Sequence, residues 1–313
     1  MSRRVLITGA SGFVGQWLSS AMLERGWTVF GGTIQGPPAA GILSRRQVEA
    51  IHWLTLDVVS DADIARAVGE NAPDAVVHLA GLASPSQANK TPVLAFEVNA
   101  LGALRLLTQL ASGARTTRVL IVGSSEQYGA HDGPIPETAQ LRPRSPYGAS
   151  KAAQEVIALQ VFRASGVPVI CTRSFNHSGL GHADDYLLPA LVRRARALPA
   201  SGGTLVIGNG TPLRDYLHVK DVVGAYILLL EAGAPGEVYN VSSGTGISVR
   251  ALAERVLGRF GVRAAIETDP ALVRTSDIPM LVGDNSKLRT ATGWKPTHSI
   301  DDIIDDLIHA APR

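Results

Sequence analysis

The sequence predicts an α/β fold with a doubly wound parallel sheet and a smaller, discontinuous C-terminal domain. Short apolar runs alternate with helical patterns through the first half of the chain, as is typical of a parallel sheet covered by helices on both faces. A β-branched run at residues 5–8 leads directly into glycines spaced three apart. After Phe175 the regular alternation ends, which indicates that a second structural unit begins there.

The glycine turn at residues 9–15 follows the first predicted strand. A strand, a glycine turn and a helix, in that order, are the context in which such glycines bind a dinucleotide in a Rossmann fold. Gly9 allows the tight turn, Gly12 the approach of a pyrophosphate, and Gly15 close packing of the helix on the sheet. The helix N-terminus adds free N–H groups and the positive end of its dipole. The alternative is a turn that binds nothing. The expected cofactor contacts here are Gly9, Ser11, Gly12, Phe13, Val14 and Gly15.

The remaining elements of the first half follow from the same alternation. The predicted strands are 28–34, 50–56, 74–79, 118–122 and 168–173. The predicted helices are 61–68, 93–110 and 147–164, with Asp61 as the N-cap of the first.

The second half is predicted to contribute to both domains. We expect a helix at 187–198 and a strand at 204–207, then a helix at 219–230 and a strand at 237–241 that rejoin the main sheet. Helices at 249–260, 286–292 and 301–310 are expected in the smaller domain. This gives a dinucleotide-binding domain of residues 1–174 and 212–243, and a smaller, substrate-binding domain of residues 175–211 and 244–313.

Composition excludes several classes of partner. The 313 residues are 45% hydrophobic and carry a net charge of only +2, which gives no reason to expect nucleic acid or an anionic membrane as a partner. The basic residues near the N-terminus precede an apolar run that glycines interrupt, so no signal peptide is expected. The one cysteine, Cys171, excludes an internal disulfide and fits a reducing compartment. We therefore expect a cytoplasmic protein without a metal site.

The end of the second predicted strand bears on cofactor choice. An acidic residue normally holds the adenosine ribose of NAD at this position, but residues 29–35 contain no Asp or Glu. The absence of that charge favours NADP(H), while NAD(H) stays possible. Arg45 and Arg46 are candidates for a 2′-phosphate only if the loop folds back; a solvated loop is at least as good an interpretation.

A tyrosine and a lysine four residues apart, Tyr147 and Lys151, share one face of a predicted helix. A free phenol has a pKa of roughly 10, and a nearby ammonium would stabilise the phenolate. Tyr147 could then act as an acid or base at a sugar oxygen. Ser124, at the carboxyl end of the fifth predicted strand, faces the ligand crevice of such a sheet. It could hydrogen-bond the same oxygen.

These motifs together resemble the extended short-chain dehydrogenase/reductase family of nucleotide-sugar enzymes, and the resemblance covers nearly the whole chain. The resemblance implies that Asp57, with Val58 beside it, meets the adenine. It implies that Ala80 and Gly81 line the phosphate and ribose path, that Asn99 supports the active site, and that Lys151 also reaches the cofactor ribose. It further implies a homodimer packed through the helices at 93–110 and 147–164.

The C-terminal half is similar to the GDP-mannose branch of the family. The segment at 173–179 resembles one whose asparagine, here Asn176, contacts the diphosphate of the sugar nucleotide. By the same resemblance Arg214 meets the diphosphate or ribose, and Arg274 is a second diphosphate arginine, since a guanidinium suits phosphate geometry. An ordinary surface ion pair is the alternative for both arginines. Ser125 and Glu126 are expected to contact the sugar.

Two reactions of this branch compete. The dehydratases carry a glutamate at the position of Glu126, which moves the C5 proton, whereas the short chain, residues 175–177 and residues 277–279 are nearer the reductase pattern. The expected activity is therefore reduction of the C4 ketone of GDP-4-keto-6-deoxy-D-mannose to GDP-D-rhamnose. Alternatives are a GDP-mannose 4,6-dehydratase, a GDP-6-deoxy-talose synthase and another nucleotide-sugar epimerase or reductase. A non-catalytic dinucleotide sensor would need none of Ser124, Tyr147 and Lys151.

Overall fold

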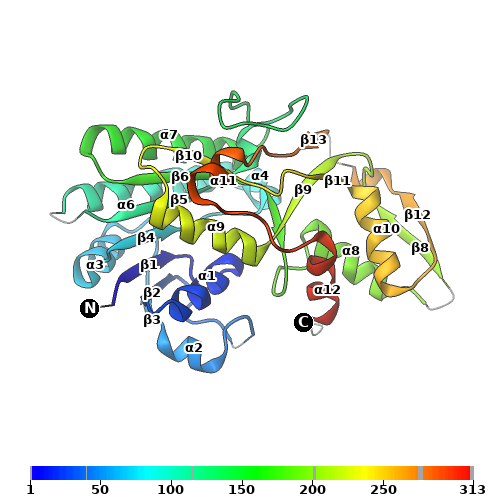
Figure 1. The fold of residues 1–313 in the computed structure, drawn as a ribbon, viewed down its shortest axis with the longest axis horizontal. Helices are drawn as coiled ribbons and strands as arrows, with labels where there is room; N and C mark the ends of the chain where they lie inside the picture. Colours follow the sequence, from blue (N-terminus) through cyan, green and yellow to red (C-terminus); the bar gives the residue numbers. More distant parts are fainter. Residues whose placement is uncertain (1, 40, 114–115, 200–201, 274–277, 311–313) are drawn as a thin grey trace.

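The central sheet has seven strands, and all of its pairs are parallel (Figure 1). The computed structural model describes residues 2–39, 41–113, 116–199, 202–273 and 278–310. The strand order is β10 (Val238–Val241), β6 (Val169–Ser174), β5 (Arg118–Ser124), β4 (Ala75–His78), β1 (Arg4–Thr8), β2 (Thr28–Thr33) and β3 (His52–Thr55). The order runs outward in opposite directions from the β1–β4 boundary, which is the switch point of a doubly wound fold. The predicted fold class is confirmed.

Helices cover both faces of this sheet, which explains why its strands are apolar on both sides. In β1, Val5 and Ile7 face one core while Leu6 faces the other. The first core is closed by α1 (Phe13–Glu24), α2 (Arg45–Ala50), α9 (Val219–Ala232) and α11 (Ser286–Thr292). The second is closed by α3 (Asp61–Asn71), α6 (Gly102–Ala111) and α7 (Pro146–Ser165).

Several helix predictions are corrected at their ends or interior. The N-cap of α3 is Ser60, whose hydroxyl accepts a hydrogen bond from the Asp63 N–H, and Asp61 is the first helical residue. The predicted helix at 93–110 is divided into α5 (Pro92–Phe96), a π-helical turn η1 (Glu97–Leu101) and α6. Two short helices lie where the sequence predicted none, α2 and α4 (Pro85–Lys90).

The helical stretch Pro92–Ala111 is apolar enough to meet a length-and-composition criterion for a membrane span, with a mean hydropathy of 1.3. In the fold it belongs to the helical layer over the sheet, where Leu106 and Leu107 are completely buried in the second core. It also carries an ion pair, since Arg105 Nη2 lies 2.8 Å from Glu97 Oε1. Packing on the sheet accounts for its apolar face.

The smaller part lies at the carboxyl side of the sheet (Figure 1). Its core is formed by α8 (Leu187–Arg196), α10 (Val249–Phe260), α12 (Ile300–His309) and the parallel pair β8 (Gly203–Ile207) and β12 (Ala264–Thr268). A second small sheet is centred on β9 (Leu213–His218), which pairs with β7 (Asn176–Ser178), β11 (Gly246–Ser248) and β13 (Met280–Leu281). Two 3₁₀ turns, η2 (Ser125–Gln127) and η3 (Pro270–Leu272), complete the elements of the described residues.

The placement of α11 in the smaller domain was wrong. Leu288 on α11 and Trp294 just after it are buried in the same core as α1 and α9. The Trp294 indole donates a hydrogen bond of 3.0 Å to the Asp221 carbonyl oxygen. The chain therefore returns to the central sheet before α12. The Trp294 ring can be buried in this core because its N–H has a hydrogen-bond acceptor there. The other domain boundaries stay predictions.

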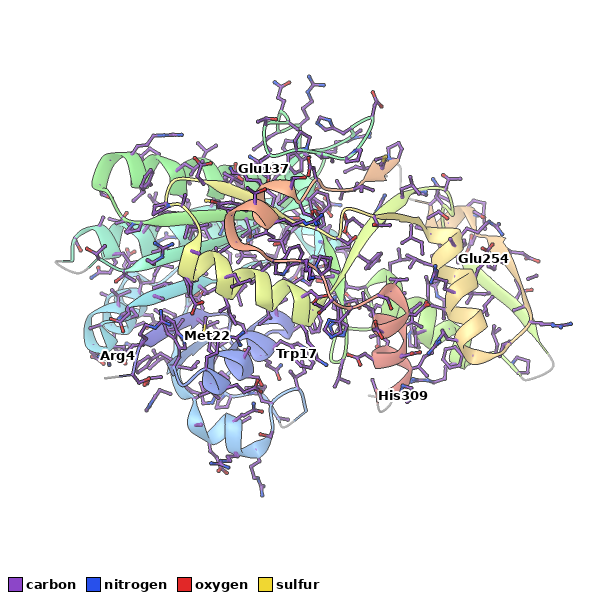
Figure 2. The ribbon with its side chains drawn as sticks, viewed as in Figure 1. Arg4, Trp17, Met22, Glu137, Glu254 and His309 are labelled. Carbon is purple, nitrogen blue, oxygen red and sulfur yellow. The ribbon has the colours of Figure 1, made fainter. Side chains whose placement is uncertain are left out.

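Trp17 ties the helix after the glycine turn to the entrance of the smaller part. It lies in the half of α1 nearer that part, whereas Met22 lies farther from it (Figure 2). Its indole donates a hydrogen bond of 3.1 Å to the Leu180 carbonyl oxygen, and the Lys220 ammonium lies 5.2 Å from the ring centre. The cofactor turn and the segment leading to the smaller part are thus fixed relative to each other.

Two helical glycines provide a matched test of this packing. A Cβ on Gly15 in α1 would lie 2.3 Å from the Gly9 carbonyl oxygen, whereas a Cβ on Gly69 in α3 would meet nothing within 4 Å. We expect Gly69→Ala to raise the free energy of unfolding by about 0.5–1 kcal/mol, since alanine is the better helix former. Gly15→Ala should lower it, because two backbone segments must separate. Urea unfolding measures both, and stabilisation by Gly15→Ala would contradict the close packing.

Candidate active site

A cleft of about 1690 Å³ runs along the carboxyl ends of the strands and between the two parts. Typical sites for one small ligand are about 300–1,000 Å³, so this cleft has room for a dinucleotide and a second ligand. Apart from the loop candidates Arg45 and Arg46 and the supporting residue Asn99, every predicted site residue that the structure describes contributes to its wall. These residues are Gly9, Ser11, Gly12, Phe13, Val14, Gly15, Asp57, Val58, Ala80, Gly81, Ser124, Ser125, Glu126, Tyr147, Lys151, Asn176 and Arg214. Arg274 lies outside the described residues.

The glycine turn has the geometry that a phosphate cradle needs. Gly9 has a φ of +71°, and a Cβ there would lie 2.9 Å from the Ala80 nitrogen. Gly12 is the N-cap of α1, so the free N–H groups of this helix begin at the cleft. The residues present therefore fit a bound pyrophosphate.

The end of β2 presents neutral side chains to the cleft. Thr33, Ile34 and Gln35 line it, and the Thr33 hydroxyl lies 2.7 Å from the Ser11 hydroxyl. Arg45 and Arg46 begin helix α2 and are not among the described residues that line the cleft. The loop after β2 therefore does not fold back to bring these two arginines to the cleft.

Tyr147 lies in the first turn of α7. Ser145 caps this helix by accepting a hydrogen bond of 3.0 Å from the Gly148 N–H, and Pro146 occupies the first helical position. Burial raises the pKa of the Tyr147 phenol above its usual value, and the Glu126 charge raises it further, while a hydrogen bond with Ser124 opposes the shift. The phenol therefore carries its proton at neutral pH and is suited to donate it.

Lys151 is engaged by groups other than the phenol. Its ammonium donates to the Val122 carbonyl oxygen at 2.9 Å and to Gln154 Oε1 at 2.8 Å. Burial lowers the pKa of Lys151 to about 8, so it stays largely protonated at pH 7. The pKa of Tyr147 is raised, not lowered as expected from this ammonium, and burial is the largest cause. A Cβ on Gly81 would lie 3.4 Å from Lys151 Nζ, which places the loop after β4 directly over the lysine.

Glu126 places a carboxylate beside two phenols of the cleft. It accepts a hydrogen bond of 2.9 Å from the Ser145 hydroxyl. Its negative charge raises the pKa of both Tyr147 and Tyr186. The carboxylate is thus close enough to the reacting end of the cleft to contact a sugar hydroxyl or to move a proton.

The substrate side is built on β7 and β9. The side chain of Asn176 hydrogen-bonds to Tyr216, and both residues line the cleft. Arg214, on the same strand as Tyr216, donates to the Leu213 carbonyl oxygen at 2.9 Å and to that of Ile278 at 2.7 Å. These carbonyl contacts hold the Arg214 guanidinium at the cleft wall.

A column of stacked rings was missed by sequence reasoning. Phe13 stacks on His182 with ring centres 4.6 Å apart, and His182 stacks on Tyr186 at 4.3 Å. All three line the cleft, so the column joins the cofactor turn to the smaller part. Ser178 lies 2.9 Å from His182 Nδ1. The density of histidine and aromatic residues at 175–186 was the only signal in the sequence.

Comparison with known proteins agrees with this geometry. The family model described as GDP-mannose 4,6 dehydratase matches residues 6–307. The chain is 32% identical to the GDP-6-deoxy-D-mannose reductase of Pseudomonas aeruginosa over 96% of this chain and 94% of that protein. The structure of RMD from Pseudomonas aeruginosa complexed with NADPH has a TM-score of 0.81 at 30% identity, covering 98% of both chains. The UDP-glucose 4-epimerase of Thermus thermophilus, in complex with NAD, has a TM-score of 0.86 at 28% identity, covering 98% of this chain and 100% of that one.

A doubly wound sheet, a dinucleotide cradle and a tyrosine–lysine helix define an NAD(P)-dependent enzyme of the short-chain dehydrogenase/reductase class that acts on nucleotide sugars. Within that class, the chain belongs to the GDP-mannose 4,6 dehydratase family of NAD-dependent epimerases and dehydratases. Family membership does not decide which reaction is catalysed, because the similar proteins include a reductase and an epimerase.

The histidine in the ring column makes stability depend on pH. Burial lowers the pKa of His182 to about 3. Between about pH 6.5 and 3 the His182 imidazole is therefore protonated in the unfolded chain but neutral in the folded protein. The free energy of unfolding falls as the pH decreases through this range. We expect His182→Phe, which keeps a stacked ring, to reduce this loss by at most about 1.4 kcal/mol per pH unit. Urea unfolding at pH 7, 6 and 5 tests it; identical pH slopes for both proteins would contradict the role of His182.

Proposed function

We propose that the protein reduces the C4 ketone of GDP-4-keto-6-deoxy-D-mannose to GDP-D-rhamnose. The observation that carries this proposal is the Tyr147 phenol, hydrogen-bonded to Ser124, in a cleft with room for a dinucleotide. Reduction of a ketone needs a proton donor, and a buried phenol with a raised pKa holds its proton until the oxygen becomes basic. The 32% identity to a GDP-6-deoxy-D-mannose reductase supports the same reaction.

Each active-site side chain has a proposed role. A nicotinamide dinucleotide bound along the glycine turn would supply the hydride. Ser124 donates a hydrogen bond to the ketone oxygen, and Tyr147 gives that oxygen its proton. Lys151 provides a fixed positive charge below the developing alkoxide, where preorganised donors are most effective. Asn176 and Arg214 bind the diphosphate, with Arg274 as a further candidate.

We propose NADPH as the preferred cofactor, with NADH accepted. The end of β2 offers no carboxylate to repel a 2′-phosphate, and its residues in the cleft are the neutral Thr33, Ile34 and Gln35. The described lining residues place no arginine or lysine there, so the preference should be small. The NADPH complex of one similar protein supports this choice. Another similar protein was solved with NAD, so the fold alone does not select between the two cofactors.

We also propose a homodimer packed through α5, η1 and α7. These elements expose large apolar side chains, and such a patch marks an interaction surface. Val93 is 82% exposed and Val156 is 62% exposed, and Leu94, Phe96 and Leu101 lie on the same helical stretch as Val93. Two helices from each copy would form the usual isologous interface of a twofold dimer.

The second candidate function is dehydration of GDP-mannose, because Glu126 retains a carboxylate where a C5 base would be needed. A dehydratase converts GDP-mannose without net cofactor consumption. A reductase leaves GDP-mannose unchanged and oxidises one NADPH for each 4-keto sugar, the sugar being supplied by a separate dehydratase.

Incubation with GDP-mannose alone, followed by chromatography, separates the two functions. We expect no product, and we expect NADPH oxidation when the 4-keto-6-deoxy sugar is added, with NADH run in parallel. Glu126→Gln should still reduce the ketone, with a loss no larger than about 1.5–3 kcal/mol, the range for a hydrogen bond to a charged group. Appearance of the 4-keto-6-deoxy sugar from GDP-mannose would overturn the reductase assignment and make Glu126 the base.

Removal of the phenol tests the proton donor. We expect Tyr147→Phe to bind NADPH normally and to lower kcat by roughly 10²–10⁴-fold, the usual contribution of general acid catalysis. Fluorescence titration measures the binding, and NADPH absorbance measures turnover. Near-normal turnover in this variant would remove Tyr147 from the mechanism.

A further inference from the structure

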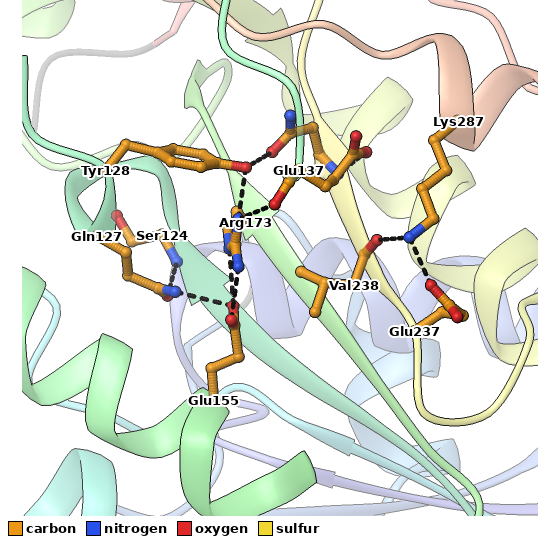
Figure 3. Close-up of polar contacts among 10 residues, drawn as sticks. Ser124, Gln127, Tyr128, Glu137, Glu155, Arg173, Glu237, Val238 and Lys287 are labelled. Carbon is orange, nitrogen blue, oxygen red and sulfur yellow. Dashed lines mark hydrogen bonds and ion pairs between the residues drawn. The ribbon is translucent and has the colours of Figure 1, made fainter. Parts of the chain in front are cut away.

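A buried polar network contacts the carboxyl end of β5, where Ser124 lies (Figure 3). Its members are Gln127, Glu155 and Arg173, and we call it the Gln127–Glu155–Arg173 network. Gln127 is completely buried, and Glu155 and Arg173 are each 5% exposed. None of the three is among the described residues that line the cleft, so the network acts on the site only through other residues.

The network begins with a bidentate ion pair. Arg173 Nε donates to Glu155 Oε2 at 2.8 Å, and Arg173 Nη2 donates to Glu155 Oε1 at 2.6 Å. Arg173 Nη1 also donates to the Tyr128 hydroxyl at 2.8 Å and to the Glu137 carbonyl oxygen at 2.9 Å. All of these contacts use the guanidinium as a rigid donor, which fixes the Glu155 carboxylate in the plane of the fork.

Gln127 extends the network to the backbone of Ser124. Its Nε2 donates to Glu155 Oε2 at 2.9 Å, and its Oε1 accepts from the Ser124 N–H at 3.1 Å. A carboxylate only accepts and a backbone N–H only donates. Only one orientation of the Gln127 amide satisfies both contacts, with Nε2 toward Glu155 and Oε1 toward the Ser124 N–H.

The network also connects Ser124 to the helix that carries Tyr147. Glu155 follows Lys151 by four residues and Tyr147 by eight, so all three side chains project from the same side of α7. A Cβ on Gly123 would lie 2.5 Å from Gln127 Oε1, so the glutamine packs directly on the backbone before Ser124. A shift of Gln127 would therefore move Ser124.

The Ser124 side chain is fixed as well. Its oxygen accepts a hydrogen bond of 3.2 Å from the Glu126 N–H. This contact leaves the hydroxyl proton for the Tyr147 phenol, with which Ser124 hydrogen-bonds. With its N–H held by Gln127 and its oxygen held by Glu126, Ser124 has a defined position relative to the Tyr147 phenol.

We propose that Gln127 is a positioning residue, which transfers the position of α7, through the Arg173–Glu155 pair, to Ser124. The inference rests on the proposed roles of Ser124 and Tyr147 in ketone reduction. It adds that the separation of these two groups is set by buried residues that contact neither substrate nor cofactor.

The test replaces Gln127 by methionine, which has a similar length and makes neither hydrogen bond. We expect kcat per bound NADPH to fall roughly 10- to 100-fold, as for a small misplacement of a reacting group. NADPH stoichiometry and the KM for the 4-keto sugar should change less than about twofold, since no lining residue is altered. Hydrogen exchange at the Ser124 amide should become faster, because its acceptor is gone.

Tyr128→Phe is the matched control. Tyr128 is also completely buried, and its hydroxyl makes two hydrogen bonds in the same network, to Arg173 and to Asn240 at 2.6 Å. Its loss should lower Tm about as much as Gln127→Met does, but leave kcat per bound NADPH and exchange at Ser124 unchanged. Equal losses of kcat in both variants, or a Gln127→Met protein that loses only Tm, would overturn the proposal.

Two further outcomes keep the test decisive. If Gln127→Met does not fold, Gln127→Asn, which cannot span both contacts, should show the same loss of kcat. If the wild-type protein does not reduce the 4-keto sugar, the proposed function fails. Exchange at the Ser124 amide then decides alone: unchanged protection in the Gln127 variants would refute the link.

Discussion

The common direction of the seven strands is the constraint on which the cleft depends. Because every strand of the sheet is parallel, all of their carboxyl ends lie at one edge. The loops after β1, β4, β5 and β6 therefore meet there, although more than 160 residues separate the first from the last. The loops after β1 and β4 run to opposite faces of the sheet, because the winding reverses between these two strands. The space between the two loops is the crevice in which a dinucleotide fits. No single segment builds this site.

The smaller part completes the cleft because it is attached at several points. The Trp17 hydrogen bond to Leu180 and the ring column through His182 both join the cofactor side to the substrate side. The return of the chain through Trp294 adds a third attachment close to α9. Side chains that would bind a dinucleotide and side chains that would bind a sugar nucleotide are therefore held in one packed unit.

Sequence patterns predicted what local chemistry determines. The glycine turn at Gly9 and the helix carrying Tyr147 were found because backbone sterics and helical spacing act over a few residues. The position of Leu288 in the core of the central sheet could not be predicted from the sequence. An apolar helix pattern indicates that one face is buried, but not against which other elements it packs. The same holds for the pKa of Tyr147, which burial raises, and for Gln127, whose two side-chain partners lie on two other elements, β5 and α7. These features depend on distant contacts.

The π-helical turn at Glu97–Leu101 has a consequence for how this family can change its length. Such a turn holds one residue more than an α-helical turn does, and here it directs the buried Asn99 to the Leu82 backbone and to Ser150. Deleting one residue would restore a regular α-helical turn, and α6 would keep its orientation relative to α5, because the wide turn absorbs the extra residue. Leu106 and Leu107 would stay on the sheet, whereas the contacts of Asn99 would be lost. The stretch can therefore lose one residue without disturbing the packing around it, but not without displacing Asn99.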